Sequence, residues 1–181
     1  MFTYMIDNKI KLKMLDLQDA EPLFTLMDQS KESLKEWLPF IDNNKSLANT
    51  EAFIKSTMQQ FSDNNGFQAG IWYEGKIAGV IGFHKIDWNN KSTSIGYWLG
   101  KDYEGSGLMT KSVQTFVNHA IVELNLNRVE IRVAEENKKS RAIPERLGFI
   151  EEGRIREAEW LYDHYVDHIV YGMLAKNWNV E

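Results

Sequence analysis

Hydrophobic and polar residues alternate at 10–14, which is the period of a half-buried strand. Ile10, Leu12 and Met14 alternate with lysines near the start of the chain. Glu74-Gly75-Lys76 reads as a hairpin turn, and Asn89-Asn90 as the next turn. The four predicted strands are 10–14, 67–73, 77–86 and 92–99. Residues 67–99 are therefore predicted to form an antiparallel meander.

In the other parts of the first 125 residues, the pattern of residues predicts helices. One helix is predicted after a cap at Asp16 or Asp19 and ends near Gln29. A short helix at 34–40 is predicted to stop at Pro39, and a third helix follows a cap at Asn49 or Thr50. From Val113 to Leu124 the apolar residues step by three and one, which predicts one buried face of a long helix.

The second half of the chain adds a strand at 128–133, a short helix at 140–147 that ends at Gly148, and strands at 150–156 and 165–174. Strand 92–99, the long helix and strand 128–133 form a βαβ unit, so these two strands are predicted to be parallel. The whole pattern predicts an α/β (α+β) fold: a mixed, mostly antiparallel seven-stranded sheet with helices on both faces.

Composition narrows the classes of protein. The length of 181 residues and the absence of repeats or linkers favour a single domain over 1–181. The chain has no cysteine, which excludes disulfides, thiolate zinc sites and cysteine nucleophiles. No apolar run reaches the about 18 residues of a membrane span, and the start of the chain has no signal-peptide pattern. We therefore expect a cytoplasmic protein without a membrane partner.

The formal net charge is -5, and this disfavours direct nucleic-acid binding, which relies on clustered Lys and Arg. The charge is compatible with a cationic amine substrate, or it serves only to keep the protein soluble. The four histidines lack partners at metal-ligand spacing, so we expect no metal.

The segment 97–110 carries the candidate chemistry. Gly105 and Gly107 lie between a predicted strand and the long helix, where glycine permits a positive φ. The first N–H groups of a helix lack internal partners and carry partial positive charge. This combination predicts a phosphate site, to which Lys111 and Ser112 could add donors. The alternative is an ordinary strand-to-helix turn. The spacing fits neither the nucleoside triphosphatase pattern nor the dinucleotide fingerprint.

Two blocks resemble a known family. Ile95-Gly96-Tyr97-Trp98-Leu99 leading into Glu104-Gly105-Ser106-Gly107-Leu108-Met109, and the run from Asn137 to Phe149, resemble the signature segments of the GNAT superfamily of N-acetyltransferases. The order of elements agrees from about Ile10 to Leu174. Segments 128–132, 157–160 and 165–168 resemble the branch that contains the ribosomal-protein-serine N-acetyltransferases. The chain departs from the family at Glu104, usually Gln or Arg, and at Met109, usually Gly or Ala.

The resemblance implies one acyl-CoA N-acyltransferase domain over 1–181, with acetyl-CoA as co-substrate. Main-chain groups at the strand end would pair with the pantetheine arm, and the glycine turn would hold the pyrophosphate. The residues implied in CoA binding are Tyr97, Trp98, Leu99, Glu104, Gly105, Ser106, Gly107, Leu108, Met109 and Asn137.

The resemblance also implies catalytic roles. Ser140 would donate a proton to the leaving thiolate, and Glu159 would act as the base that deprotonates the amine. His84 is a second candidate for the base. Asn137 and Ser140 are equally suited to cap a helix, and Glu159 could be a solvated loop carboxylate.

The implied reaction is direct acetyl transfer to a primary amine. The first candidate acceptor is the N-terminal amine of a protein, in particular a ribosomal protein, and a polyamine or small amine comes next. A CoA-binding module without catalysis and an interaction protein that only uses the fold stay open. We expect the acceptor near 34–42 and Trp160. The oligomeric state is open, a homodimer included.

Overall fold

The computed structural model describes residues 2–180 of the chain. The chain divides into two compact units, each described by itself: Met1–Gly82 with Tyr97–Ser112, and Phe83–Gly96 with Val113–Glu181. The helices are α1 Ala20–Gln29, α2 Lys31–Leu34, α3 Leu47–Ser62, α4 Leu108–Asn118 and α5 Lys138–Arg146. The strands are β1 Thr3–Met5, β2 Ile10–Met14, β3 Gln68–Tyr73, β4 Lys76–Asp87, β5 Ser92–Leu99, β6 Arg128–Ala134, β7 Ile150–Leu161 and β8 His164–Leu174.

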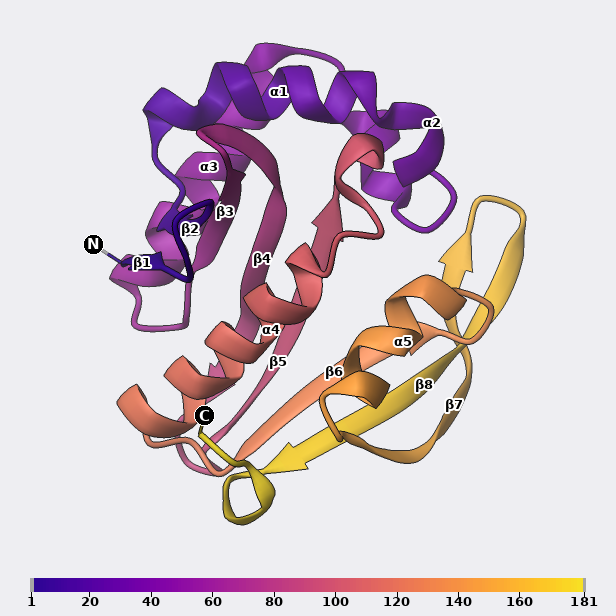
Figure 1. Cartoon of the computed structure of the whole chain (residues 1–181). Helices are drawn as coiled ribbons and strands as arrows, with labels where there is room; N and C mark the ends of the chain where they lie inside the picture. Colours follow the sequence, from indigo (N-terminus) through magenta and orange to yellow (C-terminus); the bar gives the residue numbers. More distant parts are fainter. Residues whose placement is uncertain (1, 181) are drawn as a thin grey trace. The chain divides into compact units, whose positions relative to one another are not determined.

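Hydrogen bonding joins the strands of the described residues into one mixed sheet with the order β1-β2-β3-β4-β5-β6-β8-β7 (Figure 1). The sheet has eight strands, so the prediction of seven was wrong by one. The strand missed from the sequence is β1, which pairs with β2 through Thr3–Lys13 and is exposed at all three positions. An exposed three-residue strand has no buried side and therefore no alternation to detect.

The first unit has its core where α1, α2 and α3 pack on the inner faces of the strands. Ile77 and Val80 of β4 contribute to this core, and both are buried. Leu12 and Ile71, opposite each other in the β2–β3 register, are fully buried as well but lie outside this cluster. Burying such side chains is the main favourable term in folding. The residues of this core are Leu15, Ala20, Leu23, Leu26, Met27, Leu34, Ile41, Ile54, Ile77 and Val80.

The structure corrects two helix boundaries of the first unit. The cap of α3 is Ser46, whose hydroxyl accepts the Asn49 N–H while the Asn49 side chain accepts the Ser46 N–H at 3.1 Å. Asn49 therefore closes the cap from inside the helix. Pro39 begins a 3-10 helix, Pro39–Asn43, instead of ending one. Proline suits the first turn of a helix because its missing N–H has no helical partner there.

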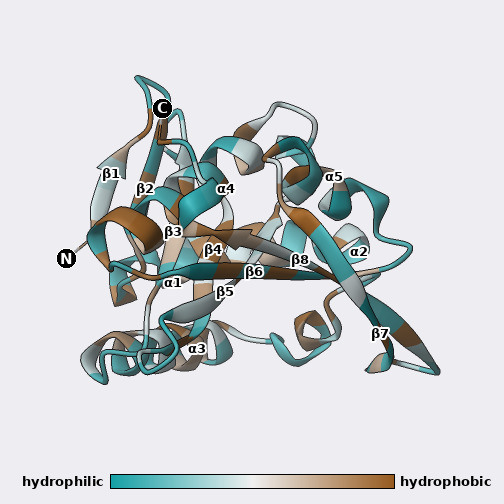
Figure 2. Ribbon diagram, turned by 90° about the horizontal axis from the view of Figure 1, so that it is seen from below, coloured by the Kyte–Doolittle hydropathy of each residue, from teal (hydrophilic) through white to brown (hydrophobic). Residues whose placement is uncertain are grey.

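The second unit contains the predicted parallel pair. Ser92–Ser94 of β5 pair with Arg128–Glu130 of β6, which confirms the βαβ prediction. β6 then pairs with β8 along its full length in antiparallel register. Val129, Ile131 and Val133 are buried and alternate with polar residues, and Figure 2 shows the matching colour alternation along β6. The sequence therefore predicted this strand and its inward face correctly.

In the second unit an ion pair joins β6 to β7 across the strand that lies between them, β8. Arg128 of β6 contacts both Glu152 carboxylate oxygens of β7, at 2.8 and 2.7 Å, and Glu130 at 2.8 Å. Gly172 of β8 lies between them: an added Cβ would be 2.1 Å from Glu152 Oε2 and 2.6 Å from Arg128 Nη1. The two-pronged contact therefore depends on the missing side chain at Gly172.

We predict that Gly172→Ala destabilises the protein by about 0.2–1 kcal/mol, because the new methyl group displaces the ends of the Arg128 and Glu152 side chains and disrupts a partly exposed ion pair. Gly153→Ala is the matched control, since an added Cβ there would meet no atom within 4 Å. The free energy of unfolding from urea titration measures both. Equal stability of the two variants would contradict the prediction.

Candidate active site

The turn before α4 has a backbone that only glycine adopts readily. Gly105 and Gly107 have φ of +79° and +76°, in the left-handed region that other residues avoid. The Ser106 hydroxyl donates to the Tyr103 carbonyl at 3.1 Å and ties the turn together. Lys111 N–H donates to the Gly107 carbonyl at 3.2 Å, so Gly107 occupies the cap position and the helix begins at Leu108.

The main-chain amides of this turn are available. Among the described residues, the N–H groups of Gly105, Ser106 and Gly107 donate no main-chain hydrogen bond. A Cβ added at Gly105 or Gly107 would meet no atom within 4 Å, so no side chain of the protein covers either glycine. The first amides of α4 also lack helical partners and carry the positive end of the helix dipole. The turn thus has the geometry of an anion site.

The side chains around the turn point in different directions. Leu108 and Met109 are buried, 2% and 5% exposed, so the unusual Met109 fills the core and leaves the turn uncovered. Glu104 is exposed. Ser112 was expected as a possible phosphate donor, but it is fully buried and donates to the Leu108 carbonyl at 2.8 Å. Lys111 is 52% exposed and pairs with Asp7 at 3.1 Å.

The end of β5 supplies the residues predicted for the pantetheine arm. Tyr97, Trp98 and Leu99 are each half-buried. The register of β5 with β6 covers three residue pairs and stops at Ser94 in the part of the chain that the structure describes. Trp98 packs against the core cluster of the first unit. Gly100 N–H donates to Ala78 O at 2.8 Å and fixes the strand exit.

The start of α5 contains two of the predicted site residues in the second unit. Asn137 is the N-cap of α5, and its side chain accepts the Ser140 N–H at 3.4 Å. The capping role left open for Asn137 is therefore observed. Ser140 is not itself the cap but the third residue of the helix, where it is half-buried.

Glu159 lies in a strand of the second unit, and the loop position left open for it was wrong. It belongs to β7, and its Oε1 is 3.2 Å from Nε2 of His168 on β8. The two side chains are 35% and 21% exposed. Sequence reasoning did not pair these residues, because it ended the first strand of this hairpin at residue 156 and left Glu159 in a loop. In the structure Glu159 lies opposite Val166 and diagonal to His168.

His84, the second candidate base, lies on β4 in the second unit. Its Nδ1 is 2.9 Å from the Ser94 hydroxyl. A Cβ at Gly96 would be 2.4 Å from His84 Nε2, so the ring occupies the space that Gly96 leaves. Desolvation of the ring, and to a smaller extent the charge of Arg132, lower its pKa from the ordinary 6.5. The imidazole is therefore neutral at neutral pH.

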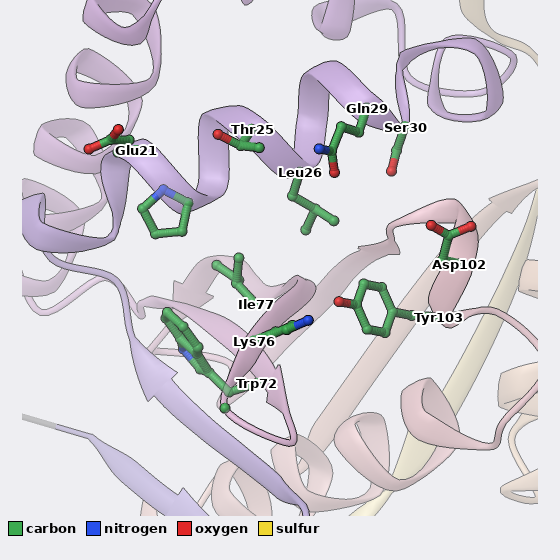
Figure 3. Close-up of a pocket in the computed structure, with 12 residues that line it drawn as sticks. Glu21, Thr25, Leu26, Gln29, Ser30, Trp72, Lys76, Ile77, Asp102 and Tyr103 are labelled. Atoms are coloured by element: carbon green, nitrogen blue, oxygen red, sulfur yellow. The ribbon is translucent and has the colours of Figure 1, made fainter.

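The first unit also has an open cleft of about 480 Å³ (Figure 3). Leu26 of α1 and Ile77 of β4 face each other across it, and Tyr103 borders it just before the glycine turn. Neither 34–42 nor Trp160, the predicted acceptor positions, is among the residues that line this cleft.

Within residues 2–180, no three His, Asp or Glu side chains gather as a metal site would require. No helix of this part is long and apolar enough to cross a membrane.

Comparison with known proteins decides the family. Residues 9–150 match the family model described as "Acetyltransferase (GNAT) domain". The chain belongs to the GNAT acetyltransferase family. It is therefore an enzyme, an N-acetyltransferase that uses acetyl-CoA as co-substrate. The end of β5 and the glycine turn that follows it, before α4, form the first of the two blocks that resemble this family in the sequence.

Three relatives match almost the whole chain. YdaF of Bacillus subtilis (strain 168), provisionally named a ribosomal N-acetyltransferase, is 39% identical, and the match covers 100% of both chains. The ribosomal-protein-serine acetyltransferase of Escherichia coli (strain K12) is 27% identical, covering 95% of this chain and 96% of that one. The structure of RimL, a ribosomal L7/L12 alpha-N-protein acetyltransferase with coenzyme A, superposes with a TM-score of 0.92 at 25% identity, covering 96% and 98%.

We predict that Gly107→Asp abolishes measurable CoA binding, because it adds a negative charge and a strained side chain to the turn that would hold the pyrophosphate. Gly148→Asp is a matched control: its φ is +79° and an added Cβ would also meet no atom within 4 Å. Calorimetric titration with CoA tests both variants after circular dichroism has shown that they fold. Unchanged CoA affinity in folded Gly107→Asp would refute the assignment.

Proposed function

We propose that this enzyme acetylates the N-terminal amine of a protein, with a ribosomal protein as first candidate, in the cytoplasm. Support comes from the relatives that match over nearly their whole length and are named for acetylation of ribosomal proteins. A polyamine or small-molecule amine is the second candidate, for which the negative net charge of the chain is compatible.

The proposal depends first on the uncovered amides of Gly105, Ser106 and Gly107 at the start of α4. A diphosphate bound there would satisfy donors that the protein leaves without main-chain partners. Main-chain groups of Tyr97, Trp98 and Leu99 would pair with the pantetheine arm as an added strand would. One of their N–H groups would also stabilise the oxyanion that forms at the thioester carbonyl.

The proposed chemistry is direct aminolysis of the thioester. The amine nitrogen, deprotonated through Glu159, attacks the thioester carbon, and the new C–N bond forms as the C–S bond breaks. The thiolate leaves as the acceptor of a hydrogen bond from Ser140, which lies in the first turn of α5. Ser140 passes a proton to the sulfur as it takes one from water, so the products are the thiol and an intact serine hydroxyl. The positive end of this nine-residue helix favours the developing negative charge. Asn137 keeps its capping role and holds the helix start that carries Ser140.

We predict that Glu159→Gln and Ser140→Ala each lower kcat by about 100-fold or more, in the range of general acid–base catalysis. The KM for acetyl-CoA should change little, because neither side chain belongs to the proposed phosphate site. His84→Gln is the comparison variant for the rival base. Steady-state kinetics with a peptide acceptor measures all three, and a larger loss in His84→Gln than in Glu159→Gln would transfer the role of base to His84.

The acceptor class can be identified directly. We predict that the purified enzyme, given acetyl-CoA and a native bacterial lysate, adds an acetyl group to the N-terminal amine of one or a few ribosomal proteins. N-terminal peptide mass spectrometry before and after reaction measures this, with Gly107→Asp as the inactive control. Acetylation only of added spermidine or of small amines would favour the second candidate.

A further inference from the structure

His168 lies on a strand whose main chain is held from both sides. In the strand order β8 lies between β6 and β7, and Figure 1 shows these three strands side by side. His168 pairs with Ala134 of β6 on one side and with Ile155 of β7 on the other. β7, which carries Glu159, is the last strand of the sheet among the described residues and pairs only with β8. A side chain on β8 therefore has a more firmly fixed origin than one on β7.

The immediate neighbours of the His168 ring are apolar. Residues two positions apart on a strand, and residues directly opposite on the next strand, share one face of the sheet. For His168 these neighbours are Val166, Val170, Ala134 and Ile155. None of their side chains can form a hydrogen bond. In the part of the chain that the structure describes, the hydrogen-bond partner of the ring is Glu159.

The contact between Glu159 and His168 assigns a role to each atom. Nε2 of His168 is 3.2 Å from Oε1 of Glu159, within the range of an N–H···O hydrogen bond. An ionised carboxylate only accepts hydrogen bonds, so Nε2 carries the proton and donates it. Oε2 of Glu159 has no hydrogen-bond partner among residues 2–180. One carboxylate oxygen is thus occupied by the ring, and the other is available to accept a proton.

A base on β7 needs such a contact to keep one orientation. Glutamate has a long side chain that loses much rotamer freedom when it is ordered, and the Glu159 side chain is 35% exposed. A general base must lie within hydrogen-bond reach of the proton that it removes. Small displacements of a catalytic group lower the rate steeply. The His168 side chain, 21% exposed, supplies the fixed donor that limits the positions of this carboxylate.

We propose that His168 is a positioning residue for catalysis: its Nε2–H holds Oε1 of Glu159, so that Oε2 is the oxygen that takes the proton of the amine. This inference rests on the proposed function, in which Glu159 is the base. His168 itself takes no proton from the amine. It fixes the carboxylate before the acceptor binds.

Two matched variants separate this role from general packing by the ring. In His168→Gln the side-chain NH₂ lies about as far from the main chain as Nε2 does, whereas in His168→Asn it lies about as far as Nδ1 and does not reach Glu159. Both variants replace the ring by the same amide group. We expect His168→Asn to lower kcat about 10- to 100-fold, with little change in the KM for acetyl-CoA, as for a misplaced base. His168→Gln should restore most of this loss.

Steady-state kinetics with a peptide acceptor measures both variants, after circular dichroism has shown that they fold. Normal kcat in His168→Asn would overturn the inference. So would a His168→Gln variant as impaired as His168→Asn, because the ring would then matter for its packing and not for its donor.

The contact can also be tested with the ring in place. The ring ¹⁵N shifts of His168 respond to a hydrogen bond at Nε2, and the signal is assigned by its absence in His168→Gln. Glu159→Ala removes the acceptor, so we expect the Nε2 shift to change. An unchanged shift would show that the two side chains are not in contact, and this readout does not depend on the activity of any variant.

Failure of the proposed function can be told apart from failure of this inference. Full activity of Glu159→Gln would remove the role of base from Glu159, whatever the His168 variants show. A strong loss of kcat in Glu159→Gln together with normal kcat in His168→Asn would leave Glu159 as the base and overturn only the positioning role of His168.

Discussion

The proposed CoA site depends on main-chain amides at Gly105 to Gly107 that have no main-chain acceptor among the described residues. Folding normally pairs buried and half-buried N–H groups, and an unpaired donor away from water is costly. Gly105 to Gly107 are exposed, and no atom lies within 4 Å of a Cβ added at either glycine. The first turn of α4 then adds the field of its dipole. The proposed phosphate site is thus made of backbone groups, which any residue type at Glu104 or Met109 also supplies.

That turn needs a rigid support, which the core provides. Leu108 and Met109 follow the glycines directly and are buried, so the start of the helix cannot shift without exposing apolar surface. Within the first turn of α4, the buried Ser112 hydroxyl donates to the Leu108 carbonyl. On the strand side, Gly100 is tied to Ala78. The glycine segment is therefore held between two fixed ends, Gly100 and the buried start of α4. Neither end covers the amides of Gly105 and Gly107.

The candidate base is positioned by the turn of the β7–β8 hairpin. The pairs Leu161–His164 and Trp160–Tyr165 next to this turn place Glu159 opposite Val166 and diagonal to His168. Beyond Glu159 the strand has a bulge, where Asp167 accepts the N–H of Glu157, a residue with a positive φ. Local strain of this kind persists where surrounding contacts over-determine it, and it is frequent at functional sites. The same hairpin carries exposed aromatic residues, Trp160 and Tyr165, stacked edge to face with ring centroids 4.8 Å apart. Trp160 directly follows the proposed base Glu159 in sequence, and the exposed pair would give the proposed acceptor an aromatic surface to contact.

The amino-acid sequence by itself determined the regular parts of this protein. Period-2 alternation predicted β2 and β6 and helical spacing predicted α4, because one buried face repeats along each of these elements. The turns at 74–76 and 89–90 marked β3, β4 and β5. Gly105 and Gly107 marked the turn before α4 because their backbone conformation is a local property of glycine. What only the tertiary structure decided depends on partners distant in the chain. β1 forms because β2 offers it an edge. Ser112 is buried because of where α4 packs. Glu159 reaches His168 because the β7–β8 pairing makes them diagonal neighbours. No local pattern encodes those contacts, since each is set by the strand or helix that packs against it.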